Sequence, residues 1–77
     1  MAQVRYEIVP VPGGWSVRCN GNAGPAYSTQ ANAVLDTLAI AEQLQKAGDK
    51  VQVRLRDTDQ GGLWRTLEPR DARLFRR

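Results

Sequence analysis

Arginine is the residue of this chain best suited to a binding chemistry. Its planar guanidinium group offers paired N–H donors that fit the oxygens of phosphate and carboxylate groups. Four arginines stand in segments that alternate with apolar residues, and four more fall in the last eight residues. The candidate binding residues are therefore Arg5, Arg18, Arg54, Arg56, Arg70, Arg73, Arg76 and Arg77.

Alternation indicates which way the first four arginines point. Successive side chains of a strand point to opposite faces of its sheet. Because Arg18 follows Val17 and Arg54 follows Val53, both arginines point to the face opposite the apolar side chains. We expect one arginine-bearing sheet face that binds nucleic acid weakly, together with the basic tail and with little sequence preference. The competing interpretation is a solvated face, and no exposed aromatic residue for base stacking is expected on it.

The residues of an active site are missing from the sequence. The chain has no histidine, which is the usual general base near neutral pH, and Cys19 is its only cysteine. A lone cysteine excludes an intramolecular disulfide and a cysteine-based zinc site. Cys19 falls on the apolar side of its segment, where free cysteines are usually buried and inert. We therefore expect no enzyme activity, no catalytic or cofactor-binding residue and no metal.

Two motifs only partly match known ligand loops. Asp57 and Asp59 precede Gln60 and Gly61, but the remaining ligand spacing and the closing glutamate of a calcium loop are absent. Gly13-Gly14 lacks the glycine–lysine–hydroxyl run of a phosphate loop. Both motifs are interpreted as turns.

Length and charge bound the class of protein. A chain of 77 residues makes one domain, which buries only about 60% of its unfolded surface. The net charge is +3, below that of a typical basic binding domain. Residues 1–7 lack a signal-peptide core, and polar residues interrupt the most apolar stretch, 31–44, so it cannot span a bilayer. We expect a protein of the bacterial cytoplasm.

The elements that position these residues follow from the apolar spacing. Residues 4–11 and 15–20 alternate with a period of two, and Pro12-Gly13-Gly14 between them predicts an antiparallel hairpin. The composition of residues 20–27 predicts a loop. A helix is then predicted over residues 29–47, because its apolar residues recur with a helical period.

The second half of the chain returns to strands. Ser28 or Thr29 is expected to cap the helix and Gly48 to end it, before a strand at 51–55. Residues 63–67 form a fourth strand with two registers open.

In one register Leu63 and Leu67 face the core, and in the other Trp64 and Thr66 do. We prefer Trp64 inward, because we expect both tryptophans to pack in the core rather than serve as ligand platforms. Beyond the strand, Pro69 opens a short helix or a basic tail, which Leu74 and Phe75 anchor.

These elements predict an α+β fold. We expect a single ββαββ domain over residues 1–68, with an antiparallel-rich sheet and one long helix packed on one face, followed by a tail at 69–77. The shared core is expected to consist of Tyr6, Ile8, Trp15, Val17, Leu38, Val51 and Val53.

Several short pieces resemble a known family. They are Tyr6, Ile8-Val9-Pro10, Gly13-Gly14-Trp15, Val17, Thr29, Ala33, Val51, Val53 and Arg56-Asp57. Over roughly residues 4–63 they resemble the small bacterial domain-of-unknown-function family 2188, which has no assigned activity, so the resemblance implies a fold and not a function. The chain departs from that pattern in its longer turn at 57–60 and its arginine-rich end.

A weaker resemblance is to small antitoxin partners of RNA-cleaving toxins, which share the Gly-Gly-Trp-like hairpin and a Thr-capped, Ala-rich helix. It implies a protein partner and an RNase-H-like topology. That topology needs a third strand before the helix, which residues 20–28 would have to supply.

Two functions fit these observations. The first is a protein-interaction or homo-oligomeric module without catalytic activity, since one helix leaves a sheet face uncovered for a homodimer or a protein partner. The alternative is a weak nucleic-acid-binding module that uses the arginine-bearing face and the basic tail. No membrane and no small-molecule substrate is expected.

Overall fold

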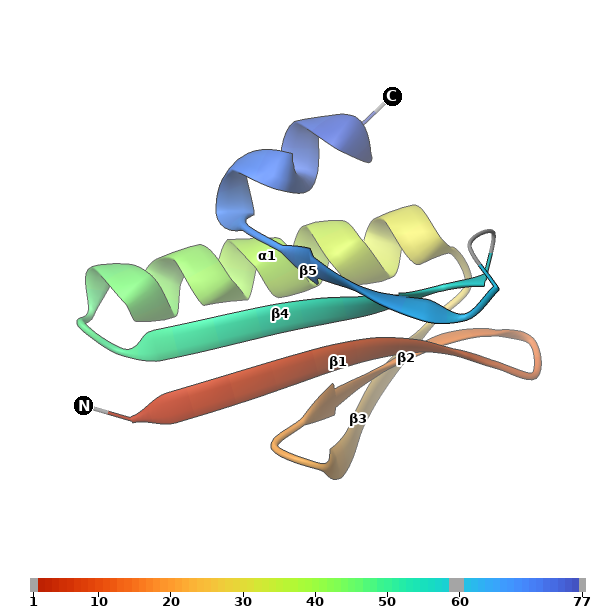
Figure 1. Cartoon of the computed structure of the whole chain (residues 1–77), viewed down its shortest axis with the longest axis horizontal. Helices are drawn as coiled ribbons and strands as arrows, with labels where there is room; N and C mark the ends of the chain where they lie inside the picture. The colour runs from red at the N-terminus through yellow and green to blue at the C-terminus, as the bar shows by residue number, and fades with distance from the viewer. Residues whose placement is uncertain (1, 59–60, 77) are drawn as a thin grey trace.

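A twisted sheet with one long helix across it makes up the protein (Figure 1). The structure is a computed structural model that describes residues 2–58 and 61–76. The elements in chain order are β1 (Gln3–Val11), β2 (Gly14–Cys19), β3 (Asn22–Tyr27), α1 (Gln30–Lys46), β4 (Lys50–Asp57), β5 (Leu63–Leu67) and the 3₁₀-helix η2 (Pro69–Leu74).

The sheet has five strands in the order β3-β2-β1-β4-β5. The two central strands, β1 and β4, run parallel, and the other three neighbouring pairs are antiparallel. The α+β class predicted from the sequence is confirmed. The ββαββ order is wrong, because a third strand precedes the helix, and the sheet is mixed.

The third strand begins at a turn that the sequence does signal. Asn20 and Gly21 have φ angles of 51° and 85°, and Cys19 pairs with Asn22 across them. Positive φ at both central residues is the requirement of a type I′ hairpin turn, for which Asn-Gly is the preferred sequence. The loop predicted for residues 20–27 is wrong because this dipeptide outweighs the poor strand propensity that follows it.

Poor strand formers are tolerated in β3 because it is the edge of the sheet. Proline cannot donate to a ladder, so Pro25 fits only at such an edge. Gly24 and Pro25 together oppose Val17, which makes a β-bulge between the pairs at Ser16 and Arg18. A Cβ on Gly24 would collide with the Val17 carbonyl oxygen, so the bulge requires glycine at this position.

The helix begins and ends close to its predicted bounds. Thr29, not Ser28, is the N-cap, and its hydroxyl oxygen accepts from the Asn32 N–H at 3.2 Å. Thr37 is 1% exposed, and its hydroxyl donates to the Ala33 carbonyl at 2.7 Å. That bond satisfies the hydroxyl group on the buried face, so the helix packs on the sheet without burying an unsatisfied polar group there.

The core lies between α1 and the sheet, and most of its predicted members are there. The buried cluster consists of Ile8, Val17, Ala33, Val34, Leu38, Ala41, Val53, Leu55 and Leu67. The other three predicted core residues, Tyr6, Trp15 and Val51, are half-buried and pack against that cluster.

The register preferred for the last strand is wrong. Leu67 pairs with Val53 and is 3% exposed, whereas Trp64 pairs with Arg56 on the other face and is 38% exposed. Leu67 decides the register because it packs into the buried cluster directly before the chain turns back toward α1. Leu63 shares its side of the strand but is 67% exposed.

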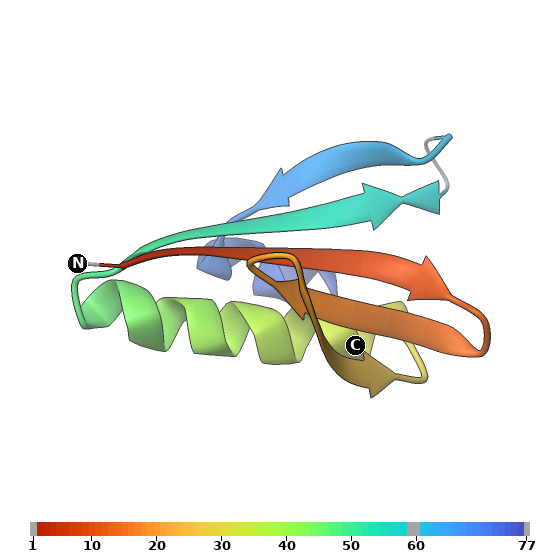
Figure 2. The same cartoon turned by 90° about the horizontal axis from the view of Figure 1, so that it is seen from below.

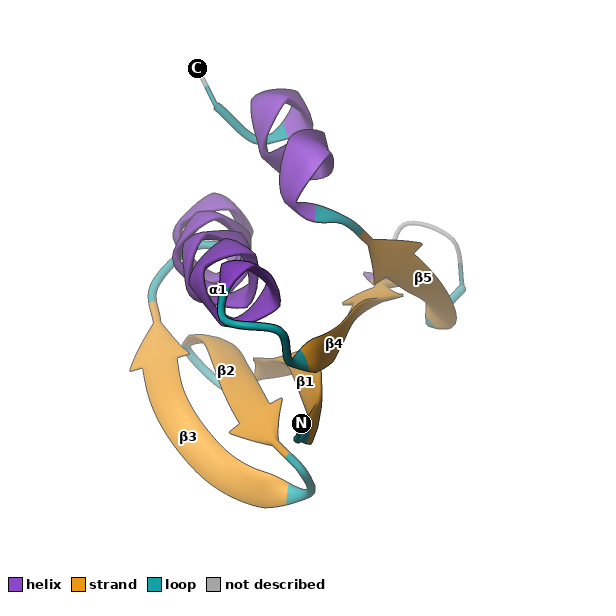
Figure 3. Ribbon diagram, turned by 90° about the vertical axis from the view of Figure 1, so that its left-hand side faces the viewer, coloured by secondary structure: helices purple, strands orange, loops and turns teal. Residues whose placement is uncertain are grey.

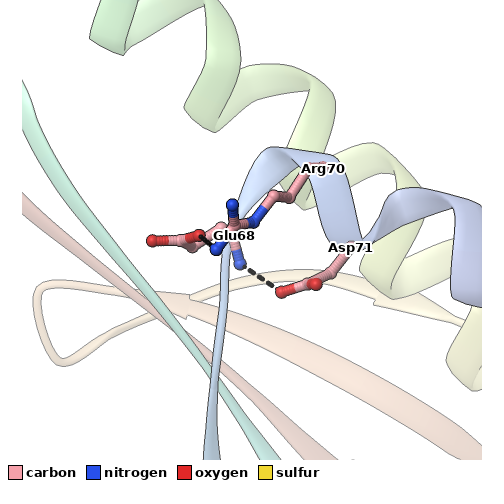
Figure 4. Close-up of polar contacts among 3 residues, drawn as sticks. All are labelled: Glu68, Arg70 and Asp71. Atoms are coloured by element: carbon pink, nitrogen blue, oxygen red, sulfur yellow. Dashed lines mark hydrogen bonds and ion pairs between the residues drawn. The ribbon is translucent and has the colours of Figure 1, made fainter.

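The C-terminal segment packs beside α1 and is not a free tail. The Glu68 N–H donates to the Asp71 carboxylate at 2.8 Å where η2 begins (Figure 4). Ala72 and Phe75 pack against the buried cluster. Leu74, one of the two predicted anchors, is 59% exposed, because η2 turns its other side to the core.

Candidate functional site

The sheet face turned away from α1 carries the side chains that could form a binding site. Cross-strand partners point to the same face, so the register defines this outer face. Its members are Gln3, Arg5, Glu7, Val9, Ser16, Arg18, Ala23, Ala26, Lys50, Gln52, Arg54, Arg56, Trp64 and Thr66. Seen along the strands, α1 and η2 both lie on the opposite side of the sheet (Figure 3).

The outer face is strongly positive. Among the described side chains, the register places five basic residues on it, Arg5, Arg18, Lys50, Arg54 and Arg56, against the single acid Glu7. The face therefore carries +4, whereas the whole chain carries +3. All of the net positive charge of the molecule is concentrated here, and the rest of the chain sums to −1.

Glu7 lies at the middle of this face. It is the register partner of Arg18 on β2 and of Arg54 on β4. One carboxylate oxygen, Oε2, lies 3.8 Å from Nη1 of Arg54, and both side chains are about one quarter exposed, at 23% and 28%. The carboxylate thus neutralises part of the charge around it and lies within ion-pair distance of Arg54.

Trp64 supplies an aromatic surface at one end of the outer face. The guanidinium carbons of Arg54 and Arg56 lie 4.6 Å and 5.7 Å from the centre of its indole ring. Both distances fall within the range of cation–π attraction. The expectation that no exposed aromatic residue lies on the arginine-bearing face is therefore wrong, and the inverted register of β5 is the reason.

The opposite end of the outer face is a shallow, open depression. It has a volume of about 580 Å³ and is lined by polar and apolar surface alike, and its polar side chains include Arg5, Glu7, Asn20, Lys50 and Gln52. The Arg5 N–H donates to the Asn20 side-chain oxygen at 2.8 Å, and the Asn20 N–H donates to the Arg5 carbonyl at 2.8 Å. These paired bonds fix the turn that forms one rim of the depression.

The eight predicted arginines do not form one surface. By their register the four strand arginines share the outer face, and Figure 2 shows η2 behind β1. Arg70, Arg73 and Arg76 belong to the segment that packs beside α1, on the other side. Arg70 also pairs with Glu68, with Nη2 at 2.9 Å from Oε2 (Figure 4). Arg77 lies outside the described residues.

Sequence reasoning missed two members of the site. Lys50 alternates with Gln52 and Arg54, so the period of two was available to place it on the same face. No comparable signal identifies Trp64, since one register turns Leu63 and Leu67 to the core and the other turns Trp64 there, so each offers large apolar residues to bury. Its placement depends on how the chain leaves the sheet after Leu67.

The inner face holds the lone cysteine beside a tyrosine. Cys19 is the cross-strand partner of Tyr6 and is half-buried. Burial, and then the charge and hydrogen bonding of Cys19, raise the pKa of the Tyr6 hydroxyl above its ordinary value. Burial, and then Asp36, likewise raise the pKa of Tyr27. These contacts tie the strands to each other and to α1, away from the outer face.

The described residues contain neither a cluster of metal ligands nor a membrane-spanning helix. Within residues 2–58 and 61–76, no three His, Cys, Asp or Glu side chains gather where they could hold a metal ion. Over the same residues no helix is long and apolar enough to cross a membrane. The predicted turn of Asp57 and Asp59 falls outside the described side chains.

Comparison with known proteins finds no family model, no curated protein and no solved structure that matches this chain. The resemblances to family 2188 and to the antitoxins therefore stay predictions. The third strand that the second resemblance requires is present at Asn22–Tyr27.

Proposed function

We propose that this chain is a nucleic-acid-binding module whose interface is the outer face of the sheet. The observation that carries the proposal is the charge of that face, +4 within a chain of +3. A face of one sign attracts a polyanion and raises its local concentration. Arginine side chains on adjacent strands can each engage a phosphate through paired N–H donors.

The charge of the outer face argues against its use as a homodimer interface. Two such faces would bring +4 against +4, and like charges set opposite each other oppose association. The β3 edge is also a poor partner for another strand, because it carries Pro25 and a bulge. A module for protein interaction or self-association is therefore the less supported alternative. Light scattering that shows a dimer at low salt would favour that alternative.

The interaction is expected to be weak and dependent on salt. Five basic side chains with one of them paired to Glu7 leave about four to neutralise phosphates. Release of counterions from a single strand gives a slope of log K against log salt of about −0.7 for each phosphate. We therefore expect a slope of about −3 and little sequence preference.

A titration with matched charge variants tests the proposal. Single-stranded and duplex DNA and RNA are titrated at about 50 mM salt, where such contacts are strong. Arg18→Ala with Arg54→Ala removes two charges from the outer face, and Arg70→Ala with Arg73→Ala removes two from the opposite side. The first pair should abolish most binding and the second should leave most of it. Absence of binding by the unaltered protein, or equal losses in both pairs, would contradict the proposal.

We further propose a role without catalysis in a reducing, cytoplasmic compartment. The chain offers no histidine, and its one thiol lies on the inner face against Tyr6. A catalytic activity of the purified protein would contradict the first part of this proposal, and cell fractionation tests the location.

A further inference from the structure

We infer that the outer face takes a single strand rather than a duplex, with a base stacked on Trp64 and the strand running along β4. This inference depends on the proposed function and names the class of nucleic acid. It combines three features of the molecule: the width of the sheet, the position of the indole ring, and the spacing of polar side chains between that ring and the depression.

The width of the sheet argues against a duplex groove. Five strands at a spacing of about 4.8 Å span about 19 Å. The major groove of B-DNA is about 12 Å wide and admits a helix or a ribbon of two strands. The sheet also curls around α1, so that its outer face is convex (Figure 3). A convex face of this width can touch a duplex along only one backbone.

Trp64 provides an aromatic surface on which an unpaired base of a single strand can stack. The bases of a duplex are paired and stacked on one another, so they cannot use that surface. Trp64 is 38% exposed on an edge strand, so we expect an unpaired base to reach the part of the indole that Arg54 and Arg56 leave uncovered. Stacking of bases on aromatic side chains, assisted by arginine, is the usual basis of single-strand recognition. Arg54 and Arg56, at 4.6 Å and 5.7 Å from the ring centre, lie where they can hold the phosphates beside that base.

A polar track leads from Trp64 to the depression. The outer side chains of β4 are Arg56, Arg54, Gln52 and Lys50, and the last two line the depression with Arg5 and Asn20. The six residue-to-residue steps of strand between 56 and 50 cover about 20 Å. A stacked single strand rises about 3.4 Å per nucleotide, so the track accommodates about six nucleotides.

The fluorescence of Trp64 provides a test of this inference. In a Trp15→Phe background the only remaining tryptophan is Trp64, and its fluorescence is followed while DNA and RNA oligonucleotides of two to ten residues are added. Quenching should saturate, and affinity should rise with length up to about six nucleotides and then level off. Duplexes of the same length should bind at least about tenfold more weakly, since they offer no unpaired base to Trp64.

Substitutions on β5 separate stacking from charge. Trp64→Ala should lower the affinity for single strands about 5- to 150-fold, whereas Trp64→Phe should keep most of it. Leu63→Ala is the matched control, because Leu63 is an exposed apolar residue of the same strand on its other side, and it should change nothing. Thermal melting confirms that each variant is folded before it is titrated.

The outcomes distinguish this inference from the proposed function. Equal affinity for duplex and single strand, polyglutamate binding as tight as an oligonucleotide, or a Trp64→Ala variant that binds like the parent would overturn the inference. In each of those cases a loss of binding in the Arg18 and Arg54 variant would leave polyanion binding by the outer face in place. No binding of any nucleic acid at about 50 mM salt would remove both.

Discussion

Glu7 and Arg54 lie side by side on the parallel central strands, with Oε2 of the glutamate 3.8 Å from Nη1 of the arginine. Of the side chains that the structure describes on this face, this carboxylate is the only negative one, against five positive ones. It limits how strongly the face attracts a polyanion, and it lies beside an arginine that also contacts Trp64. Its removal should therefore separate attraction from positioning.

Glu7→Gln should raise the affinity for nucleic acid up to about fivefold, because a repulsive charge about 4 Å from a bound phosphate costs about 1 kcal/mol in water. Glu42→Gln is the control, since Glu42 pairs with Lys46 at 3.3 Å on α1, on the other side of the sheet. It should change affinity little. Weaker binding by Glu7→Gln would show instead that the position of Arg54 matters more than net charge.

Leu38→Ala should lower the free energy of unfolding by about 2–5 kcal/mol, because Leu38 is 1% exposed and fills the space between α1 and the sheet. A domain of this size has little more stability than that to lose. Ile40→Ala on the same helix is the control, since Ile40 is 46% exposed, and it should change stability by less than about 1 kcal/mol. Urea denaturation measures both, and equal effects would contradict the packing.

Gly24→Ala should destabilise the β3 edge by about 1–3 kcal/mol, because the added methyl group meets the Val17 carbonyl oxygen and the strands must separate. Amide hydrogen exchange should show β3 losing protection while β1 and β4 keep theirs. Ala23→Ser, at an exposed neighbouring position, should have an effect within about 0.5 kcal/mol. Unchanged protection in Gly24→Ala would mean that no such bulge exists.

The sequence predicts the parts of this fold that depend on periodicity. Alternation around Val17 and Val53 places Arg18 and Arg54 on one face, and the register confirms that the two arginines share it. The helix and its buried Leu38 follow from the apolar spacing in the same way.

The predictions that were wrong concern features of the fold that depend on tertiary contacts. Strand β3 has the composition of a loop. It forms because the turn at Asn20 reverses the chain and places it beside β2, at the edge of the sheet. Trp64 faces outward because Leu67 takes the core position. The arginines of the C-terminal segment do not lie on the outer face, because Phe75 packs against the buried cluster on the side of the sheet that α1 covers. None of these contacts produces a regular spacing of apolar residues in the sequence, so the residues of the site could be predicted only in part.

Cys19 should react slowly with a thiol reagent in the folded protein and rapidly when the protein is unfolded. It faces inward on β2, is half-buried and contacts the Tyr6 side chain, its partner on β1. Tyr6→Ala should therefore raise the labelling rate in the native state, and Tyr27→Ala, which opens a different part of the inner face, should do so much less. Native labelling as fast as in denaturant would contradict the inward orientation.

The two inner tyrosines should make stability fall in alkaline solution. Burial is the main cause that raises the pKa of Tyr6 and of Tyr27 above the ordinary value of 10.0, and the neighbouring Cys19 and Asp36 add to it. An acid whose pKa is higher in the folded state favours folding while it is protonated. That stability is fully present below pH 10.0 and is lost as pH rises through the higher folded pKa. The midpoint of urea denaturation should therefore decrease above about pH 10.

Phenylalanine variants isolate the contribution of each tyrosine to that decrease. Tyr6→Phe and Tyr27→Phe remove the ionisable group and keep the ring, so each should flatten the alkaline decrease, and the double variant should flatten it most. Because the ring packing is retained, the midpoint near neutral pH should change much less than the slope above pH 10. Absorbance near 295 nm follows tyrosine ionisation directly, and both hydroxyls should titrate above the value of 10.0. A double variant with the same alkaline profile as the parent would show that neither tyrosine is linked to folding.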